Sequence, residues 1–426
     1  MRLREKLDTA LFGIEMLANM ALERVETGIV FNPMRPELRV DPHPFYRRLR
    51  EQDPFHRSRP ADGWVLTRYA DILEVLGDRS FSADERHQRR WPRMRARMVR
   101  AGLPDPYETD RASMLRLDPP DHTRLRNLVS KAFTPRAVER MRPVVEKYVG
   151  ELLGRLEGRR EMELIGDFAA PIPVSVIAEM LGVPVADRER FRHWSDEAVR
   201  TLGDGSLDDR RRAEAAMAEL GQYIEAIAEE RRREPREDLI SALVQAEDEG
   251  DRLSRNELFT TCVLLLVAGN ETTTKLIANS VVALLRSPDQ LELLRREPER
   301  MPAAVEELLR YDGPVQLTSR RVTADRELLG RRLRRGQQLV LVLAAANRDP
   351  EQFEDPDRLD VTRREVRHLA LSHGLHFCLG AQLARLEATL SLEALVTRFP
   401  GLRFAGPIEW GDNTVLRGPR SLPLAF

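Results

Sequence analysis

Two cysteines occur in the 426-residue chain, Cys262 and Cys378, and their surroundings predict different roles. Cys378 lies near the end of a glycine-containing loop, HLALSHGLHFCLG, just before an amphipathic helical pattern. A helix N-terminus offers unpaired N–H groups and positive potential, and both stabilise a thiolate. Gly374 and Gly380 lack a β-carbon, so the backbone there can closely approach a flat ligand. These features favour a reactive thiolate at Cys378 over the structural role that is usual for a lone cysteine, and Cys262, within an apolar run, is expected to lie in the core.

A second group of reactive side chains lies in the sequence AGNETT, from Ala268 to Thr273. Glycine and successive threonines are unfavourable in a helix, yet apolar runs flank this segment on both sides. The runs predict that Glu271 and Thr272 lie at buried depth, where an acid and an alcohol require a function. A polar interruption facing solvent is the simpler alternative. A threonine hydroxyl in the middle of a helix can also bond back to a preceding carbonyl and loosen the helix locally.

The element that carries this pair is predicted to be a helix of about 32 residues, from Ser254 to Arg286. Ser254 and Glu257 form the Ser-x-x-Glu pattern of a capping box, which marks the start of the helix. A helix this long and this apolar is expected to run through the middle of the protein. Further helices are predicted after Ser287, which precedes a proline, and over residues 301–311.

Strand patterns are fewer and short. They cover residues 64–67, an apolar run from Gln338, and the tail after Leu402. The sequence therefore predicts a mainly α protein with a small β-sheet region. No repeat, linker or composition shift occurs, so we expect one domain over residues 1–426. Residues 1–30 are interpreted as an amphipathic N-terminal extension, and no fused reductase is expected.

From Leu371 to Gly380 the cysteine loop resembles the haem-binding signature of the cytochrome P450 family, F-G-x-G-x-H-x-C-x-G. Four positions match the signature: Gly374, His376, Cys378 and Gly380. Leu371 and Ser372 stand where the family usually has Phe and Gly. The resemblance implies the cytochrome P450 fold, a large helical domain with a long central helix. It also implies that Cys378 ligates the iron of haem b and that His376 contacts a propionate.

Other segments resemble the family in the same order along the chain. AGNETT matches the acid–alcohol motif, which implies that Ala268 and Gly269 lie against the haem, that Thr272 holds ordered water, and that Glu271 relays protons. Further matches imply cations that bind the propionates, namely His122, Arg126 and Arg320. Another matching set implies a structural ion-pair network, namely Glu307, Arg310 and Arg358. By itself, a Glu-x-x-R pair is usually a solvated surface pair.

The resemblance implies a monooxygenase that inserts one oxygen atom of O2 into a lipophilic small molecule of fatty acid, steroid, terpenoid or polyketide type. Electrons would come from a ferredoxin or flavodoxin with its reductase. Coupling, desaturation or isomerisation by the same cofactor is an alternative, as is a haem carrier or gas sensor without turnover. A helical scaffold without haem would leave the several matching motifs unexplained.

Composition excludes several other classes of protein. Lys and Arg total 68 against 69 Asp and Glu, so a nucleic-acid partner is not expected. No uncharged run near the N-terminus reaches the ~20 residues that span a bilayer, so integral membrane association is not expected. Two distant cysteines cannot form a disulfide framework, which favours a reducing, cytoplasmic location.

Two segments are candidates for the substrate entrance. Residues 86–111 contain eight arginines with Trp91 among them, and one arginine is a hypothetical anchor for a substrate carboxylate. A solvated loop is the simpler interpretation. Residues 202–209, rich in glycine and aspartate, are suited either to a mobile hinge or to an ordinary surface loop.

Overall fold

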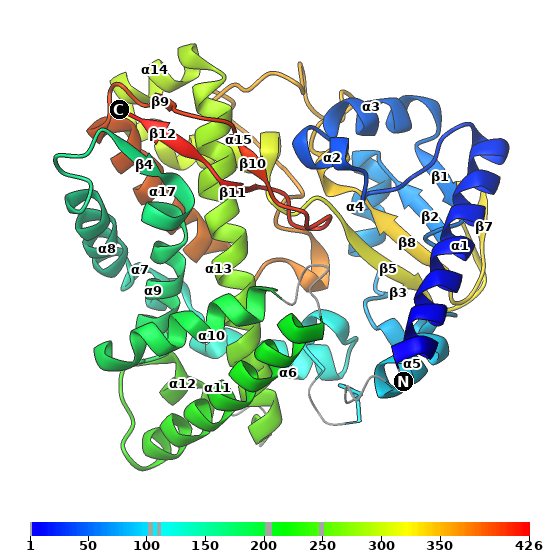
Figure 1. Ribbon diagram of the computed structural model, residues 1–426, viewed down its shortest axis with the longest axis horizontal. Helices are drawn as coiled ribbons and strands as arrows, with labels where there is room; N and C mark the ends of the chain where they lie inside the picture. The colour runs from blue at the N-terminus through cyan, green and yellow to red at the C-terminus, as the bar shows by residue number, and fades with distance from the viewer. Residues whose placement is uncertain (1, 101–104, 109–111, 201–206, 247–250) are drawn as a thin grey trace.

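The computed structural model describes residues 2–100, 105–108, 112–200, 207–246 and 251–426 (Figure 1). Helices dominate it, as the sequence predicted. The α-helices are α1 Arg2–Thr27, α2 Pro36–Val40, α3 His43–Gln52, α4 Tyr69–Gly77, α5 Trp91–Arg100, α6 Asp121–Ala132, α7 Pro135–Glu139, α8 Arg142–Gly154, α9 Pro171–Met180, α10 Arg188–Arg200, α11 Leu207–Arg233, α12 Leu239–Gln245, α13 Arg255–Leu285, α14 Pro288–Arg296, α15 Met301–Asp312, α16 Leu343–Ala346 and α17 Ala381–Arg398.

The strands are short, and most pair across long sequence separations. They are β1 Phe55–Ser58, β2 Gly63–Leu66, β3 Phe81–Ser82, β4 Glu161–Glu163, β5 Thr318–Val322, β6 Arg326–Leu328, β7 Arg331–Leu333, β8 Gln338–Leu341, β9 Arg403–Phe404, β10 Glu409–Trp410, β11 Pro419–Ser421 and β12 Pro423–Ala425.

The main sheet has the strand order β1-β2-β8-β5-β3, with β2 parallel to β8 and the other pairs antiparallel. A β-carbon on Gly63 would lie 1.7 Å from the Gln338 carbonyl oxygen, so only glycine allows β2 to pair with β8 there. The apolar run from Gln338 is a strand only as far as Leu341, because residues 343–346 turn into the short helix α16.

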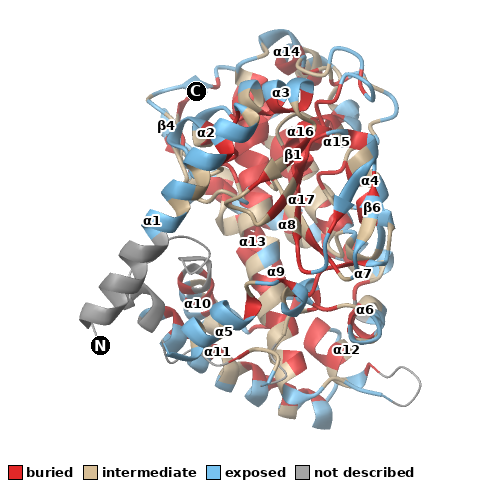
Figure 2. Ribbon diagram, turned by 90° about the vertical axis from the view of Figure 1, so that its right-hand side faces the viewer, coloured by how far each residue is buried: buried red, intermediate tan, exposed pale blue. Residues whose placement is uncertain are grey.

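The helix α13 is the central element, as predicted. The Ser254 hydroxyl accepts from the Glu257 backbone N–H, and the Glu257 carboxylate accepts from the Ser254 N–H, which completes the capping box. Every residue from Thr273 to Leu284 is buried. The helix packs against α9, α10, α11, α14, α15 and α17, and it runs through the helical part of the molecule, away from the main sheet (Figures 1 and 2).

The predicted amphipathic helix near the N-terminus forms as α1, and its C-terminal part is attached to β1. Glu23 is fully buried and accepts hydrogen bonds from the Phe31 N–H, the His56 imidazole and the Arg59 N–H at 2.7–2.9 Å. The opposite face of α1 exposes apolar side chains, including Val25. No helix in the described part of the chain has the length and apolarity to cross a bilayer.

The ion-pair network differs from its prediction in one residue. Glu307 and Arg310, both fully buried in α15, form a bidentate pair with distances of 2.6 and 2.7 Å, as expected. The third cation is Arg363, whose Nε lies 3.3 Å from Glu307. The prediction of Arg358 was wrong, because only its backbone carbonyl accepts from Arg310 while its side chain is exposed. The chain turns after Asp360, whose N–H donates to Glu307, and this turn brings residue 363 to the carboxylate.

We predict that Glu307→Gln lowers the free energy of unfolding by about 3–5 kcal/mol, because the buried Arg310 guanidinium loses its counter-charge. Arg363→Ala should cost about 1–3 kcal/mol through the lost charged hydrogen bond. The matched control Arg358→Ala should change the free energy of unfolding by less than about 0.5 kcal/mol. Urea unfolding followed by circular dichroism measures all three. A larger effect of Arg358→Ala than of Arg363→Ala would contradict this assignment.

Candidate active site

The cysteine loop depends on glycine at position 374. The turn η6, Gly374–His376, precedes Cys378, whose N–H donates to the Leu371 carbonyl at 2.9 Å. Gly374 has a φ of 68°, and a β-carbon there would lie 2.4 Å from the Leu76 carbonyl oxygen of α4. Gly374 therefore permits a close approach between backbones. A β-carbon on Gly380 would meet no atom within 4 Å, so Gly380 alone leaves the open space predicted for a flat ligand.

The departures from the family signature have a visible backbone consequence. Ser372 has a φ of 65°, in the left-handed region that favours glycine. The serine therefore keeps a glycine-like conformation, at a cost of about 1–2 kcal/mol relative to glycine. Leu371 is half-buried and packs against the helical core.

The thiol of Cys378 is free, and the residue is half-buried. Burial raises its pKa, whereas the Gly380 N–H and the guanidinium groups of Arg385 and Arg126 act in the opposite direction. The position before a helix N-terminus favours the thiolate, but the loss of water around the sulfur disfavours it. Since the protein does not lower the thiol pKa by itself, the positive charge of a ligated metal would be needed to hold the thiolate.

Four predicted cofactor residues come together beside this loop from three parts of the chain. His122 and Arg126 lie on α6, Arg320 on β5 and His376 in η6. The rings of His122 and His376 are 4.3 Å apart between centroids, and Arg126 donates to the Phe377 carbonyl at 2.8 Å. The structure thus gathers residues that are more than 250 positions apart in sequence.

Arg320 is the buried arginine of this group, and the Asp118 carboxylate is near enough to raise its pKa. Arg320 is 5% exposed, and no carboxylate of the described residues lies within ion-pair distance of it. Burial, followed by the charge of Arg321, lowers the pKa of Arg320 to about 10. Burial and then neighbouring cations lower the pKa of His122 to about 4 and of His376 to about 3. The buried Nδ1 of His122 has no hydrogen-bond partner among the described residues.

A site with one buried arginine, one half-buried arginine and two histidines is suited to a dianionic ligand, because a buried guanidinium without an ion-pair partner is costly. The free thiol of Cys378 and the open space at Gly380 lie on the same loop as His376. A flat, metal-containing group with two carboxylates, such as haem, fits all of these features. The residues present therefore fit the cofactor that the sequence implied.

The acid–alcohol segment lies in the middle of α13 and does not interrupt it. The Thr272 hydroxyl donates to the Ala268 carbonyl, as predicted. The expected burial of Glu271 and Thr272 holds only in part, because both are half-buried, and Ala268 before them is exposed. Asn270 and Thr273, which point to other sides of the helix, are buried. One face of α13 is therefore open at this segment, whereas the helix is buried on all sides from Thr273 to Leu284.

Sequence reasoning missed Lys275, one turn after Glu271. Its ammonium nitrogen lies 2.6 Å from Glu271 Oε1 and donates to the Leu416 carbonyl at 3.0 Å. The i,i+4 spacing of an acid and a lysine was a usable signal. It was overlooked because such pairs are usually solvated, whereas the side chain of Lys275 is only 8% exposed. Cys262 is buried as predicted, and burial raises its pKa to about 12.

The two candidate entrance segments are only partly described. Residues 201–206, most of the expected hinge, and Arg111 lie outside the described residues. In the arginine-rich segment, Arg86, Arg90 and Arg95 already form ion pairs with Asp84, Asp62 and Asp105, at 2.6, 3.7 and 2.5 Å. The predicted carboxylate anchor is therefore not one of these three in their present conformations.

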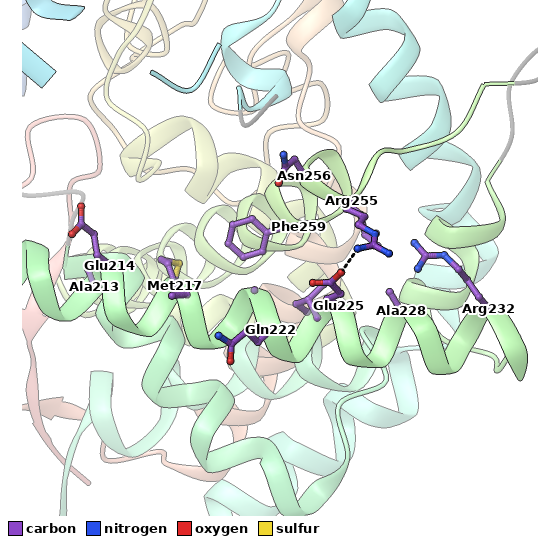
Figure 3. A pocket seen from close by; sticks show the side chains of 14 residues that line it. Ala213, Glu214, Met217, Gln222, Glu225, Ala228, Arg232, Arg255, Asn256 and Phe259 are labelled. Atoms are coloured by element: carbon purple, nitrogen blue, oxygen red, sulfur yellow. Dashed lines mark ion pairs between the residues drawn. The ribbon is translucent and has the colours of Figure 1, made fainter. Parts of the chain in front are cut away.

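A groove of about 700 Å³ lies elsewhere, between α11 and the first turns of α13 (Figure 3). Its floor is apolar, with Met217 and Phe259, and Arg255 at its rim pairs with Glu225 at 2.8 Å. Phe259 precedes Glu271 by about three helical turns, so the groove is separate from the acid–alcohol segment.

Comparison with known proteins agrees with this geometry. The family described as Cytochrome P450 matches residues 206–401. The chain is 43% identical to Cytochrome P450 107B1 of Saccharopolyspora erythraea over 90% of this chain and 95% of that protein. It is 41% identical to Cytochrome P450 monooxygenase PikC of Streptomyces venezuelae, over 95% and 97% of the two chains.

The solved structure of the bacillaene polyketide synthase cytochrome P450 PksS, from Bacillus subtilis 168, superposes on this chain with a TM-score of 0.84. It shares 37% identity, with 93% of this chain and 99% of that chain covered. Because the identity covers nearly the whole chain, the similarity to these proteins is not limited to the cysteine loop. The chain therefore belongs to the cytochrome P450 family and is a haem-dependent monooxygenase of bacterial type that acts on lipophilic substrates.

Proposed function

We propose that this chain binds haem b between the cysteine loop and α13 and inserts one oxygen atom of O2 into a lipophilic small molecule. The observation that carries the proposal is the buried Arg320 guanidinium, which has no ion-pair partner among the described residues, close to two histidines and a free thiol. Bound haem supplies the redox chemistry, in which thiolate ligation favours O–O cleavage.

Cys378 would ligate the haem iron in this proposal. Its N–H is bonded to the Leu371 carbonyl, so the loop holds the residue independently of the cofactor. His122, Arg126, Arg320 and His376 bind the two propionates, and Gly374 and Gly380 shape the loop around them. Arginine is suited to this task because its planar guanidinium pairs with carboxylates through two parallel hydrogen bonds.

Glu271 and Thr272 would move and hold protons at the open side of α13. The Thr272 hydroxyl donates to the Ala268 carbonyl, which orients its oxygen lone pairs toward the open side of α13 as acceptors for water. The half-buried Glu271 carboxylate is placed to exchange protons with solvent and pass them along α13. The exposed Ala268 and the neighbouring Gly269 carry little or no side chain, so they allow the cofactor to lie close to the helix.

We infer a polyketide-type substrate before a fatty acid, steroid or terpenoid. The support is the relative whose name places it in bacillaene polyketide synthesis. Product analysis distinguishes oxygen insertion from coupling, desaturation or isomerisation. In this proposal, electrons come from a ferredoxin or flavodoxin with its reductase.

Cys378→Ser is predicted to abolish the thiolate-type Soret band of the dithionite-reduced, carbon monoxide-bound protein, because a serine oxygen cannot donate as the thiolate does. Cys262→Ser is the matched control, since it changes the other cysteine, and the band should persist in whatever fraction folds. Absorbance spectra of both variants measure this. An unchanged band in Cys378→Ser would refute the axial assignment.

Arg320→Gln is predicted to increase the rate of haem loss about tenfold, because one charged hydrogen bond to a propionate is worth about 1.5–3 kcal/mol. Transfer of haem to apomyoglobin measures this rate. Arg367→Gln, which changes an arginine whose side chain is 78% exposed, serves as the control and should leave the rate unchanged. Equal rates in wild type and Arg320→Gln would exclude a propionate contact.

Glu271→Gln is predicted to lower product formation about 100-fold, since the amide cannot relay protons. Thr272→Ala should divert reducing equivalents to hydrogen peroxide, whereas Thr272→Ser retains the hydroxyl and should remain coupled. Product and peroxide yields per electron pair measure both effects. Coupled turnover by Thr272→Ala would show that the hydroxyl is dispensable.

A further inference from the structure

Lys275 is an almost buried ammonium inside the central helix, and its surroundings explain why it is tolerated there. Its side chain is 8% exposed, and its nitrogen contacts the Glu271 carboxylate at 2.6 Å and the Leu416 carbonyl at 3.0 Å. Leu416 belongs to the loop between β10 and β11. One lysine thus touches both the predicted proton-relay acid and a loop about 140 residues later in the chain.

The loop leaves space for the lysine stem. A β-carbon on Gly418 would lie 2.6 Å from Cγ and 2.8 Å from Cβ of Lys275, so only glycine fits opposite this side chain. Gly418 does not have a positive φ, so it is not needed for a left-handed backbone conformation. Space for Lys275, and not backbone freedom, is therefore the reason for glycine at position 418.

A second contact of α13 holds the same loop. One helical turn after Lys275, the Asn279 amide donates to the Arg417 carbonyl at 3.1 Å and to the Asp312 carbonyl at 3.0 Å. The Arg417 guanidinium pairs with the Asp312 carboxylate. Lys275 and Asn279 therefore bind consecutive carbonyls of the loop, but only Lys275 also touches Glu271.

The electrostatics require the Glu271 contact. A nearly buried ammonium needs an anionic partner, and a backbone carbonyl is neutral. Glu271 is the only carboxylate of the described residues within ion-pair distance of Lys275. The pair therefore restrains the Glu271 carboxylate, whose side chain is 22% exposed and would otherwise sample several rotamers.

We propose that Lys275 is a positioning residue that holds the Glu271 carboxylate for proton delivery and ties it to the loop over residues 411–418. The proposal rests on the relay function proposed for Glu271. It implies that loss of the Lys275 charge alters proton delivery without any change at Thr272.

Lys275→Met is the decisive variant, since it keeps the length of the stem and removes the charge. It should lower product per electron pair about tenfold, because a misplaced relay group costs this much or more, and should change the pH profile of turnover. The apparent substrate Kd should stay within about twofold of wild type, since binding is not the affected step. Asn279→Ala is the matched control, which loosens the same loop but retains the Lys275–Glu271 pair, and its pH profile should not change.

The effect of Lys275→Met should disappear in the Glu271→Gln background, because residues that act through one another are not additive. A second readout does not depend on turnover. Glu271→Gln should lower the Tm in the presence of Lys275, whose ammonium is left unpaired, but not in Lys275→Met. The four proteins of this cycle are compared by calorimetry, in apo and haem-loaded forms.

Equal losses of product from Lys275→Met in both backgrounds, or the same pH profile change in Asn279→Ala, would overturn the proposal. Wild-type turnover by Glu271→Gln would refute the relay itself and this inference with it. A defective Glu271→Gln combined with an unaffected Lys275→Met would refute the inference alone.

Discussion

The burial of the central helix is the constraint on which the site depends. From Thr273 to Leu284 every residue of α13 is buried, so this half of the helix is surrounded by other elements and cannot rotate or slide. The register of the preceding turn is fixed as a consequence. Ala268 and Thr272 lie just where packing ends, and this is why polar chemistry can occur in the interior of an apolar helix.

Several buried charges in this protein are paired. Glu307 is neutralised by Arg310 and Arg363, Asp312 by Arg417, and Lys275 by Glu271. The buried guanidinium of Arg320 has no such partner among the described residues. A dianionic ligand beside the cysteine loop accounts for this unpaired positive charge.

The two sides of the site are built in different ways. On the thiol side, a loop is held by backbone hydrogen bonds and by a glycine that approaches α4, so Ser372 must adopt a glycine-like conformation. On the side of α13, a regular helix presents its side chains at fixed spacing. Their common support is the contact between α13 and α17, the helix that follows the loop.

The sequence alone determined the features that depend on local spacing. The capping box at Ser254, the helical class, the cysteine at a loop–helix junction and the pairing of Glu307 with Arg310 all arise from residues a few positions apart. Local spacing also predicts the bond from Thr272 to Ala268, which the helix geometry requires.

Tertiary structure decided what depends on distant segments. It selected Arg363 over Arg358, because a turn after Asp360 determines which side chain reaches the buried carboxylate. It left Glu271 half-buried, since burial depends on which elements pack beside a helix and not on the apolarity of its neighbours in sequence. It also buried Lys275 against Leu416, a contact between residues far apart in the chain, for which pairwise spacing carries no information.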